Sequence, residues 1–169
     1  RLSVSGLWQG KLANTYNTHH TSYKGEYCLR PGSSPSYTNI DAIGWSVGEP
    51  KVPKARDHYH YKGLYLDGNT VVLSYSVGSR DILESPGASE DGNIVWRNFK
   101  VGPGDKKLFC LVTSGGLKAT GGKLVQGEGG TTWLSFPPSK TPTSVSVAMG
   151  DSPLRTGKDD IEKHTKVGP

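Results

Sequence analysis

Apolar and polar residues alternate over short runs along this chain, which is the period of half-buried β-strands. The clearest case is the segment 59–78, YHYKGLYLDGNTVVLSYSVG, in which two alternating runs flank Asp67-Gly68-Asn69. Asp-Gly and Gly-Asn pairs favour the tight turn of a β-hairpin. The second run places one apolar set on a single face, opposite Val72, Ser74 and Ser76: Val71, Leu73, Tyr75 and Val77. The sequence therefore predicts a hairpin with at least one face in a core.

The first run of this hairpin places three tyrosines in one row, Tyr59, Tyr61 and Tyr65. Such a row can bind a ligand with its ring faces, or it can be ordinary scaffold. The face that the row occupies depends on the strand register, because a shift of one residue moves every side chain to the opposite face. We favour the scaffold interpretation and keep all three tyrosines as ligand-binding candidates.

Further runs with strand character follow one another along the chain. They are residues 2–12, 26–30, 81–85, 93–101, 108–113, 131–136 and 143–149. The run 108–113, LFCLVT, is short and continuously apolar, which is typical of a strand buried on both faces. In 93–101 a single charged residue, Arg97, interrupts an apolar face. The pattern predicts an all-β fold, an antiparallel sandwich or barrel of about eight strands.

Two segments differ from the rest. Residues 33–57 form one long irregular loop with several prolines, and loops of this length are often functional. Residues 151–169 are charged and poor in apolar residues, so we expect a linker or a docked tail after a domain at 1–150. The chain begins RLSVSGLW, as though already inside a strand, and we expect it to be a piece of a longer protein.

Composition supports many short strands joined by turns. Hydrophobic residues are 33% of the chain, and 23 Gly with 11 Pro make up about a fifth of it. The formal net charge is +5, but the basic residues are spread out rather than gathered in a dense stripe, so we expect no nucleic-acid partner. No segment approaches the roughly 20 apolar residues of a membrane-spanning helix, so we expect no membrane insertion.

Catalytic and metal-binding patterns are weak. His58 and His60 share a strand face and are weak metal candidates, which Asp57 or His19 would have to complete, because zinc takes three or four ligands. A nucleophile elbow and a phosphate-binding loop are both missing from the sequence. We therefore expect no cofactor and assign no catalytic residue. Whether the chain is an enzyme stays uncertain, with the balance against it.

Trp45 and the two cysteines each leave two interpretations open. Trp45 lies in the long loop, where it either anchors the loop to the sheet or meets a ligand. Cys28 and Cys110 both fall in expected strands, and a disulfide between them is compatible with an exported protein. Sequence spacing by itself decides neither question.

The segment 60–85, HYKGLYLDGNTVVLSYSVGSRDILES, resembles an uncharacterised β-rich domain of large exported proteins of planctomycetes and verrucomicrobia. In those proteins the domain precedes a sugar-dehydrogenase-like propeller and often c-type cytochrome modules. Leu7-Trp8 with Gly10, and the segment 98–103, resemble further strands of the same domain. The resemblance implies export to the periplasm or cell surface, and an accessory role beside an oxidoreductase. The chain itself carries no propeller or haem motif, and no catalytic residues carry over.

We therefore expect a non-catalytic accessory module of an exported, oxidoreductase-linked protein, which docks to neighbouring domains or binds glycan. One alternative is a structural subunit of a larger assembly, with its sheet edges as contact surfaces. Another is a metal-dependent enzyme fragment that uses the strand of His58 and His60, together with Asp57 and Tyr61.

Overall fold

The structure, a computed structural model, describes residues 6–7, 37–38, 44–51, 59–68, 70–89, 94–113 and 118–150. These residues form twelve strands and one 3₁₀ turn, η1 (Glu128–Gly130). The strands are β1 (Gly6–Leu7), β2 (Tyr37–Thr38), β3 (Trp45–Val47), β4 (Tyr59–Asp67), β5 (Thr70–Val77), β6 (Arg80–Ala88), β7 (Ile94–Val101), β8 (Leu108–Thr113), β9 (Lys118–Thr120), β10 (Leu124–Gln126), β11 (Thr132–Phe136) and β12 (Thr143–Gly150). The prediction of an all-β fold is confirmed.

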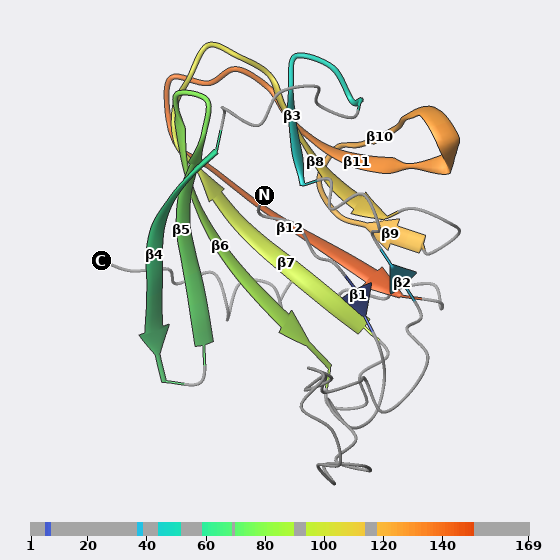
Figure 1. The fold of residues 1–169 in the computed structure, drawn as a ribbon, viewed down its shortest axis with the longest axis horizontal. Helices are drawn as coiled ribbons and strands as arrows, with labels where there is room; N and C mark the ends of the chain where they lie inside the picture. The colour runs from blue at the N-terminus through green and yellow to red at the C-terminus, as the bar shows by residue number, and fades with distance from the viewer. Residues whose placement is uncertain are drawn as a thin grey trace, which may run out of the picture.

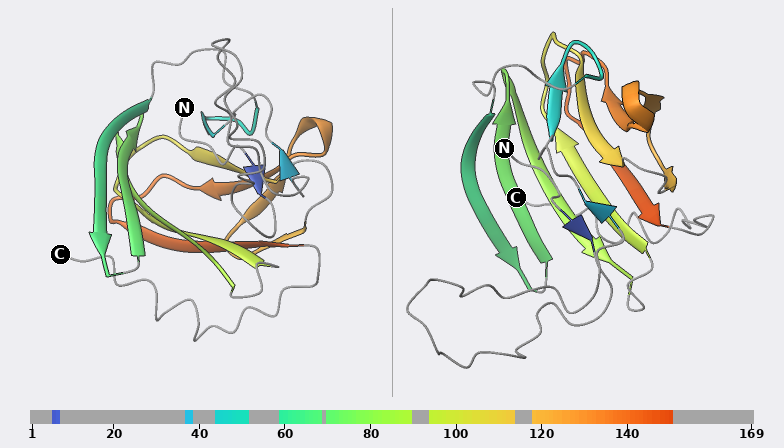
Figure 2. Two further views of the ribbon diagram at one scale, coloured as in Figure 1. Left: turned by 60° about the horizontal axis from the view of Figure 1, so that its bottom comes forward. Right: turned by 45° about the vertical axis from the view of Figure 1, so that its right-hand side comes forward.

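Two antiparallel sheets face each other in a sandwich (Figure 1). The large sheet has six strands in the order β4-β5-β6-β7-β12-β9, and the small sheet has four in the order β10-β11-β8-β3. Strands β1 and β2 form a separate pair. Figure 2 shows the large sheet curving around one side of the small sheet without closing on it. Of the two architectures that the sequence allowed, the fold is therefore the sandwich and not a closed barrel.

Strand β8 lies at the centre of the small sheet, between β11 and β3, and all six of its residues are buried. Leu108, Cys110 and Val112 alternate toward the large sheet, while Phe109 and Leu111 pack with Trp133 on the other face. The continuous apolar run predicted this burial on both faces, because a strand covered on two sides has no polar alternation.

The core between the sheets is centred on Trp45, which is fully buried. Its ring lies 5.4 Å from that of Phe136, 5.6 Å from that of Phe99 and 6.1 Å from that of Tyr75, measured between centroids. Edge-on and tilted aromatic contacts of this kind add to the free energy gained by burying the rings. The indole therefore joins β3 and β11 of the small sheet to β5 and β7 of the large one.

The prediction of one long irregular loop at 33–57 is wrong in part. Residues 45–47 are strand β3, which pairs with β8 in the register Trp45↔Cys110, and residues 37–38 are strand β2. Local sequence gave no strand signal here because β3 is only three residues long and its pairing partner is more than 60 residues away in the chain.

Several predicted features lie outside the described residues. They are the strand at 26–30, the tail at 151–169, Cys28 and His58. Among the residues that are described, no helix is long and apolar enough to cross a membrane.

Candidate functional site

Strand β4 is one edge of the large sheet and changes its register half-way along. Tyr59 pairs with Val77 and Tyr61 with Tyr75, but Gly63 then pairs with Ser74, so Lys62 is an extra residue without a counterpart on β5. This is a β-bulge, which bends a strand and re-aims the residues beyond it. Gly63 has a φ of 143°, a backbone conformation that residues with a Cβ rarely adopt. The glycine after Lys62 therefore makes the bulge possible.

The bulge divides the row of tyrosines between the two faces of the sheet. Before it, Tyr59 and Tyr61 lie opposite Val77 and Tyr75 and share the inner face, toward the core. After it, Tyr65 lies opposite Val72 and is on the outer face. The predicted single row of three tyrosines is therefore wrong, because it assumed unbroken alternation along β4. A flat stacking surface built from all three rings is not formed.

Beyond the bulge, the β4–β5 hairpin carries exposed apolar side chains. Leu64 and Leu66 lie on the inner face, opposite Leu73 and Val71. The exposed large hydrophobic residues of the described structure are all on these two strands: Tyr61 (53%), Leu64 (51%), Tyr65 (61%), Leu66 (72%) and Val71 (37%). We call these five residues the β4 patch. They cluster on two neighbouring strands, with Tyr65 on the outer face of the sheet and the others on the inner face. Clustered exposed apolar side chains mark contact sites more often than scattered ones do.

The position of the hairpin explains why the patch is exposed. β4 and β5 stand at one edge of the large sheet, and their turn at Gly68 points away from the small sheet (Figure 1). Leu64, Leu66 and Val71, next to the turn, are exposed, so this end of the hairpin is not covered by the small sheet. Tyr75 and Val77, farther from the turn, are fully buried by it.

Trp45 and Tyr59 turn out to belong to the scaffold. Trp45 is fully buried, so its ring offers no open face to a ligand, which favours the interpretation that it anchors its segment to the sheets. Tyr59 is half-buried against the core and its hydroxyl donates a hydrogen bond to the carbonyl of Trp45. Together they fix β3 against the start of β4.

Of the two weak metal candidates, His58 and His60, the structure describes only His60. His60 is exposed and lies opposite Ser76, whereas His58 is outside the described residues. No group of three or more His, Cys, Asp or Glu side chains suited to a metal occurs in the described part of the chain. A metal site at His58 and His60 stays a prediction.

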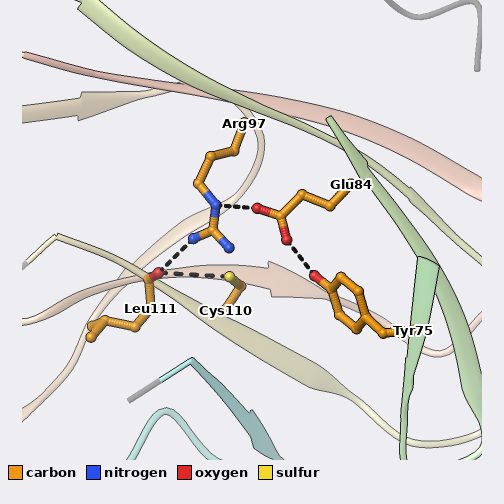
Figure 3. Close-up of polar contacts among 5 residues, drawn as sticks. All are labelled: Tyr75, Glu84, Arg97, Cys110 and Leu111. Atoms are coloured by element: carbon orange, nitrogen blue, oxygen red, sulfur yellow. Dashed lines mark hydrogen bonds and ion pairs between the residues drawn. The ribbon is translucent and has the colours of Figure 1, made fainter. Parts of the chain in front are cut away.

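A second cluster of polar groups lies inside the sandwich (Figure 3). The carboxylate of Glu84 accepts a hydrogen bond from Nε of Arg97 at 2.6 Å and one from the hydroxyl of Tyr75 at 2.5 Å. Nη1 of Arg97 donates to the carbonyl of Leu111 at 3.1 Å, and the guanidinium lies 4.9 Å from the ring centroid of Phe99. The side chains of Glu84 and Arg97 are only 5% and 3% exposed. The cluster therefore joins β5, β6 and β7 to β8 through the core.

Burial and charge shift the ionisation of the groups around this ion pair. Burial, together with the Glu84 carboxylate, raises the pKa of Tyr75 well above its ordinary value. Burial raises the pKa of the Cys110 thiol to about 12, although Arg97 opposes the shift. Burial alone would lower the pKa of Arg97, but the acidic groups around it, Cys110 and Glu84 foremost, raise it overall. At neutral pH the tyrosine and the thiol are therefore neutral beside the ion pair of Arg97 and Glu84.

This cluster is structural rather than catalytic. Both carboxylate oxygens of Glu84 are engaged by side chains of the core, and none of its members is exposed. The sequence indicated one member of the buried ion pair, because Arg97 interrupts an apolar strand face. Its partner was missed because Glu84 is on another strand, and pairing of Glu84 with Phe99 across β6 and β7 is what brings the two side chains together.

Cys110 carries a free thiol whose sulfur lies 3.6 Å from the carbonyl oxygen of Leu111. Cys28, the partner expected in a disulfide, lies outside the described residues. The disulfide between Cys28 and Cys110 stays a prediction.

The described residues define an all-β sandwich with a buried ion pair in its core and exposed apolar side chains on one edge hairpin. Residues 1–84 match the model of a family described as a domain of unknown function, DUF6797. The matched segment includes Trp45, the whole β4–β5 hairpin and Glu84, and it ends before Arg97. Comparison with curated proteins and with solved structures gave no match. The resemblance to an uncharacterised β-rich domain is supported to this extent.

Proposed function

We propose that this chain is a non-catalytic accessory module of an exported, oxidoreductase-linked multidomain protein, and that it works by binding other protein modules. Export and the link to an oxidoreductase rest on the family resemblance of the segment 60–85. Protein binding rests on one observation, the exposed apolar patch on the edge strand β4. Exposing five large apolar side chains on the two faces of one hairpin is costly in water, and covering them with protein removes that cost.

Protein binding is favoured over glycan binding by the arrangement of the rings. A glycan site of the kind expected from the sequence would use Trp45 and a row of tyrosines as stacking surfaces. Trp45 is in the core, and Tyr61 and Tyr65 lie on opposite faces of the sheet. The remaining members of the patch, Leu64, Leu66 and Val71, are aliphatic and suit the apolar centre of a protein interface better than a sugar face.

Site-specific photo-crosslinking tests this proposal. Leu66 is replaced by p-benzoyl-phenylalanine in the protein expressed in its native cell, which is irradiated, and adducts are identified by mass spectrometry. Lys123, which is exposed and directly precedes β10, an edge strand of the other sheet, takes the same substitution as the control. A protein adduct that forms at position 66 and not at 123 supports the proposal. Adducts that are equal at both positions, or absent at 66, would show that the patch does not bind protein.

A further inference from the structure

The outer edge of β4 has the features of a strand that pairs with another strand. In the described structure β4 is hydrogen-bonded on one side only, to β5, and no described strand lies beyond it. An unpaired edge offers its backbone N–H and C=O groups to any extended chain that approaches. Natural edge strands are normally protected by a charge or a bulge, and β4 has both at one position, Lys62.

The bulge and charge at Lys62 leave a short stretch of β4 with regular strand geometry, which we call the regular edge. The bulge ends regular pairing on one side, and the turn at Gly68 ends it on the other. Between them lie the five residues 63–67, which pair with β5 without a break. Tyr65 is the middle residue of this regular edge.

We propose that the occupant of this edge is a second copy of the same chain, paired antiparallel through β4 and centred on Tyr65. This inference rests on the proposed function and names the partner of the β4 patch. A two-fold axis perpendicular to the sheet at Tyr65 joins two large sheets into one continuous sheet. Residue 63 then lies opposite 67 of the second copy, and residue 64 lies opposite 66.

This register buries the apolar side chains on both faces. Leu64 and Leu66 are both on the inner face, so Leu64 of each copy lies opposite Leu66 of the other. On the outer face the two Tyr65 rings meet across the axis. Because a two-fold contact uses one surface twice, a patch with its apolar residues in symmetric positions around Tyr65 is complementary to itself.

The area of the patch agrees with a small symmetric interface. Tyr61 lies before the bulge and Val71 is on β5, so the apolar area on the paired segment comes from Leu64, Tyr65 and Leu66. Their exposed fractions correspond to about 350 Å² per copy, or about 700 Å² for two, which is the size of a weak interface. Such an interface forms a dimer that depends on protein concentration rather than an obligate one. In Figure 1 the end of β4 next to the β4–β5 turn, where residues 63–67 lie, points away from the small sheet.

Sedimentation velocity from about 1 µM to about 1 mM tests for the dimer. The wild-type chain should shift from monomer to dimer across this range. Leu66→Lys should weaken the dimer by about a hundredfold or more, because each dimer contains the substituted site twice. Ser144→Lys adds the same charge at an exposed position on β12 and should leave dimerisation unchanged. Leu66 is 72% exposed, so its variant should fold normally, which a thermal melt verifies.

A disulfide across the axis tests the register. In a Cys28→Ser background, Tyr65→Cys should form an intermolecular disulfide under mild oxidation, since opposed residues in an antiparallel pair have Cα atoms about 4.5–5.5 Å apart. Lys118→Cys, on the opposite edge strand β9, should not crosslink. Equal crosslinking at 65 and 118, or a dimer that Leu66→Lys does not weaken, overturns the inference. A chain that stays monomeric at every concentration also overturns it. If the photo-adduct at position 66 is then another protein, the proposed function stands while its partner is not a second copy.

Discussion

The buried ion pair between Glu84 and Arg97 offers the sharpest test of how the sandwich is held together. Glu84→Gln keeps an oxygen that can accept from Tyr75, so the substitution removes mainly the negative charge. Arg97 is then left as a charged group in the core with one carbonyl partner, Leu111. Breaking a buried pair in this way costs about 3–5 kcal/mol, because the remaining charge has lost its water and its counter-ion.

A double variant separates the charge effect from lost packing. Glu84→Gln with Arg97→Met removes both charges, keeps the acceptor for Tyr75 and fills much of the arginine volume. Leu111 keeps the contact with the thiol of Cys110. Since replacing a buried pair by apolar groups is often close to neutral, the double variant should recover about 2 kcal/mol or more relative to Glu84→Gln alone.

Equilibrium unfolding in urea, followed by tryptophan fluorescence, measures these differences in the free energy of unfolding. The ion pair of Lys62 and Asp81 is the control, because its side chains are 39% and 71% exposed. Asp81→Asn should cost less than about 1 kcal/mol. If Glu84→Gln costs no more than Asp81→Asn, the buried charge of Arg97 does not depend on Glu84. If the double variant loses the sum of the two single losses, the two charges do not interact.

Three further predictions follow from the core and the bulge. Because burial raises the pKa of Cys110 from 9.0 to about 12, the folded state keeps this proton after the unfolded state has lost it. Its contribution to stability is complete below pH 9 and falls as the pH rises toward 12, by about 2 kcal/mol between pH 9 and 10.5, so Cys110→Ala should flatten the high-pH loss in urea titrations. Trp45→Ala should lower the free energy of unfolding by about 3–5 kcal/mol, whereas Tyr61→Ala at the surface should change it by less than about 1 kcal/mol; equal losses would contradict the core assignment. Gly63→Ala should cost about 1–3 kcal/mol because alanine is strained at positive φ, with faster hydrogen exchange in β4; unchanged exchange and stability would mean that the bulge does not need this glycine.

Strand periodicity and turn chemistry in the sequence were enough to predict the fold class. The predicted hairpin at 59–78 is confirmed, with its turn at Gly68, and so is the expectation that at least one of its faces lies in the core, which is the face with Tyr75 and Val77. The two-sided burial of β8 follows from an apolar run too short for a helix. These features depend on neighbours in the chain, and local sequence therefore specifies them.

The candidate site depended on contacts between distant segments. Arg97 stood out in the sequence as a charge on an apolar face, but its partner became visible only when β6 and β7 were paired. Trp45 could be assigned to the core only once β3 was paired with β8.

Alternation and turn residues act over a few positions, so local sequence was enough to predict the all-β class, the hairpin and the longer strands, but not the short strands β2, β3, β9 and β10. The tertiary structure alone decided which side chains are buried and which are exposed on β4. One extra residue, Lys62, reverses the faces of everything beyond it, and pattern reading has no signal for that insertion. Leu64, Leu66 and Val71 were missed as surface residues for a second reason. An apolar residue in a strand is exposed or buried according to how far the opposing sheet extends, and that extent is a property of the whole sandwich.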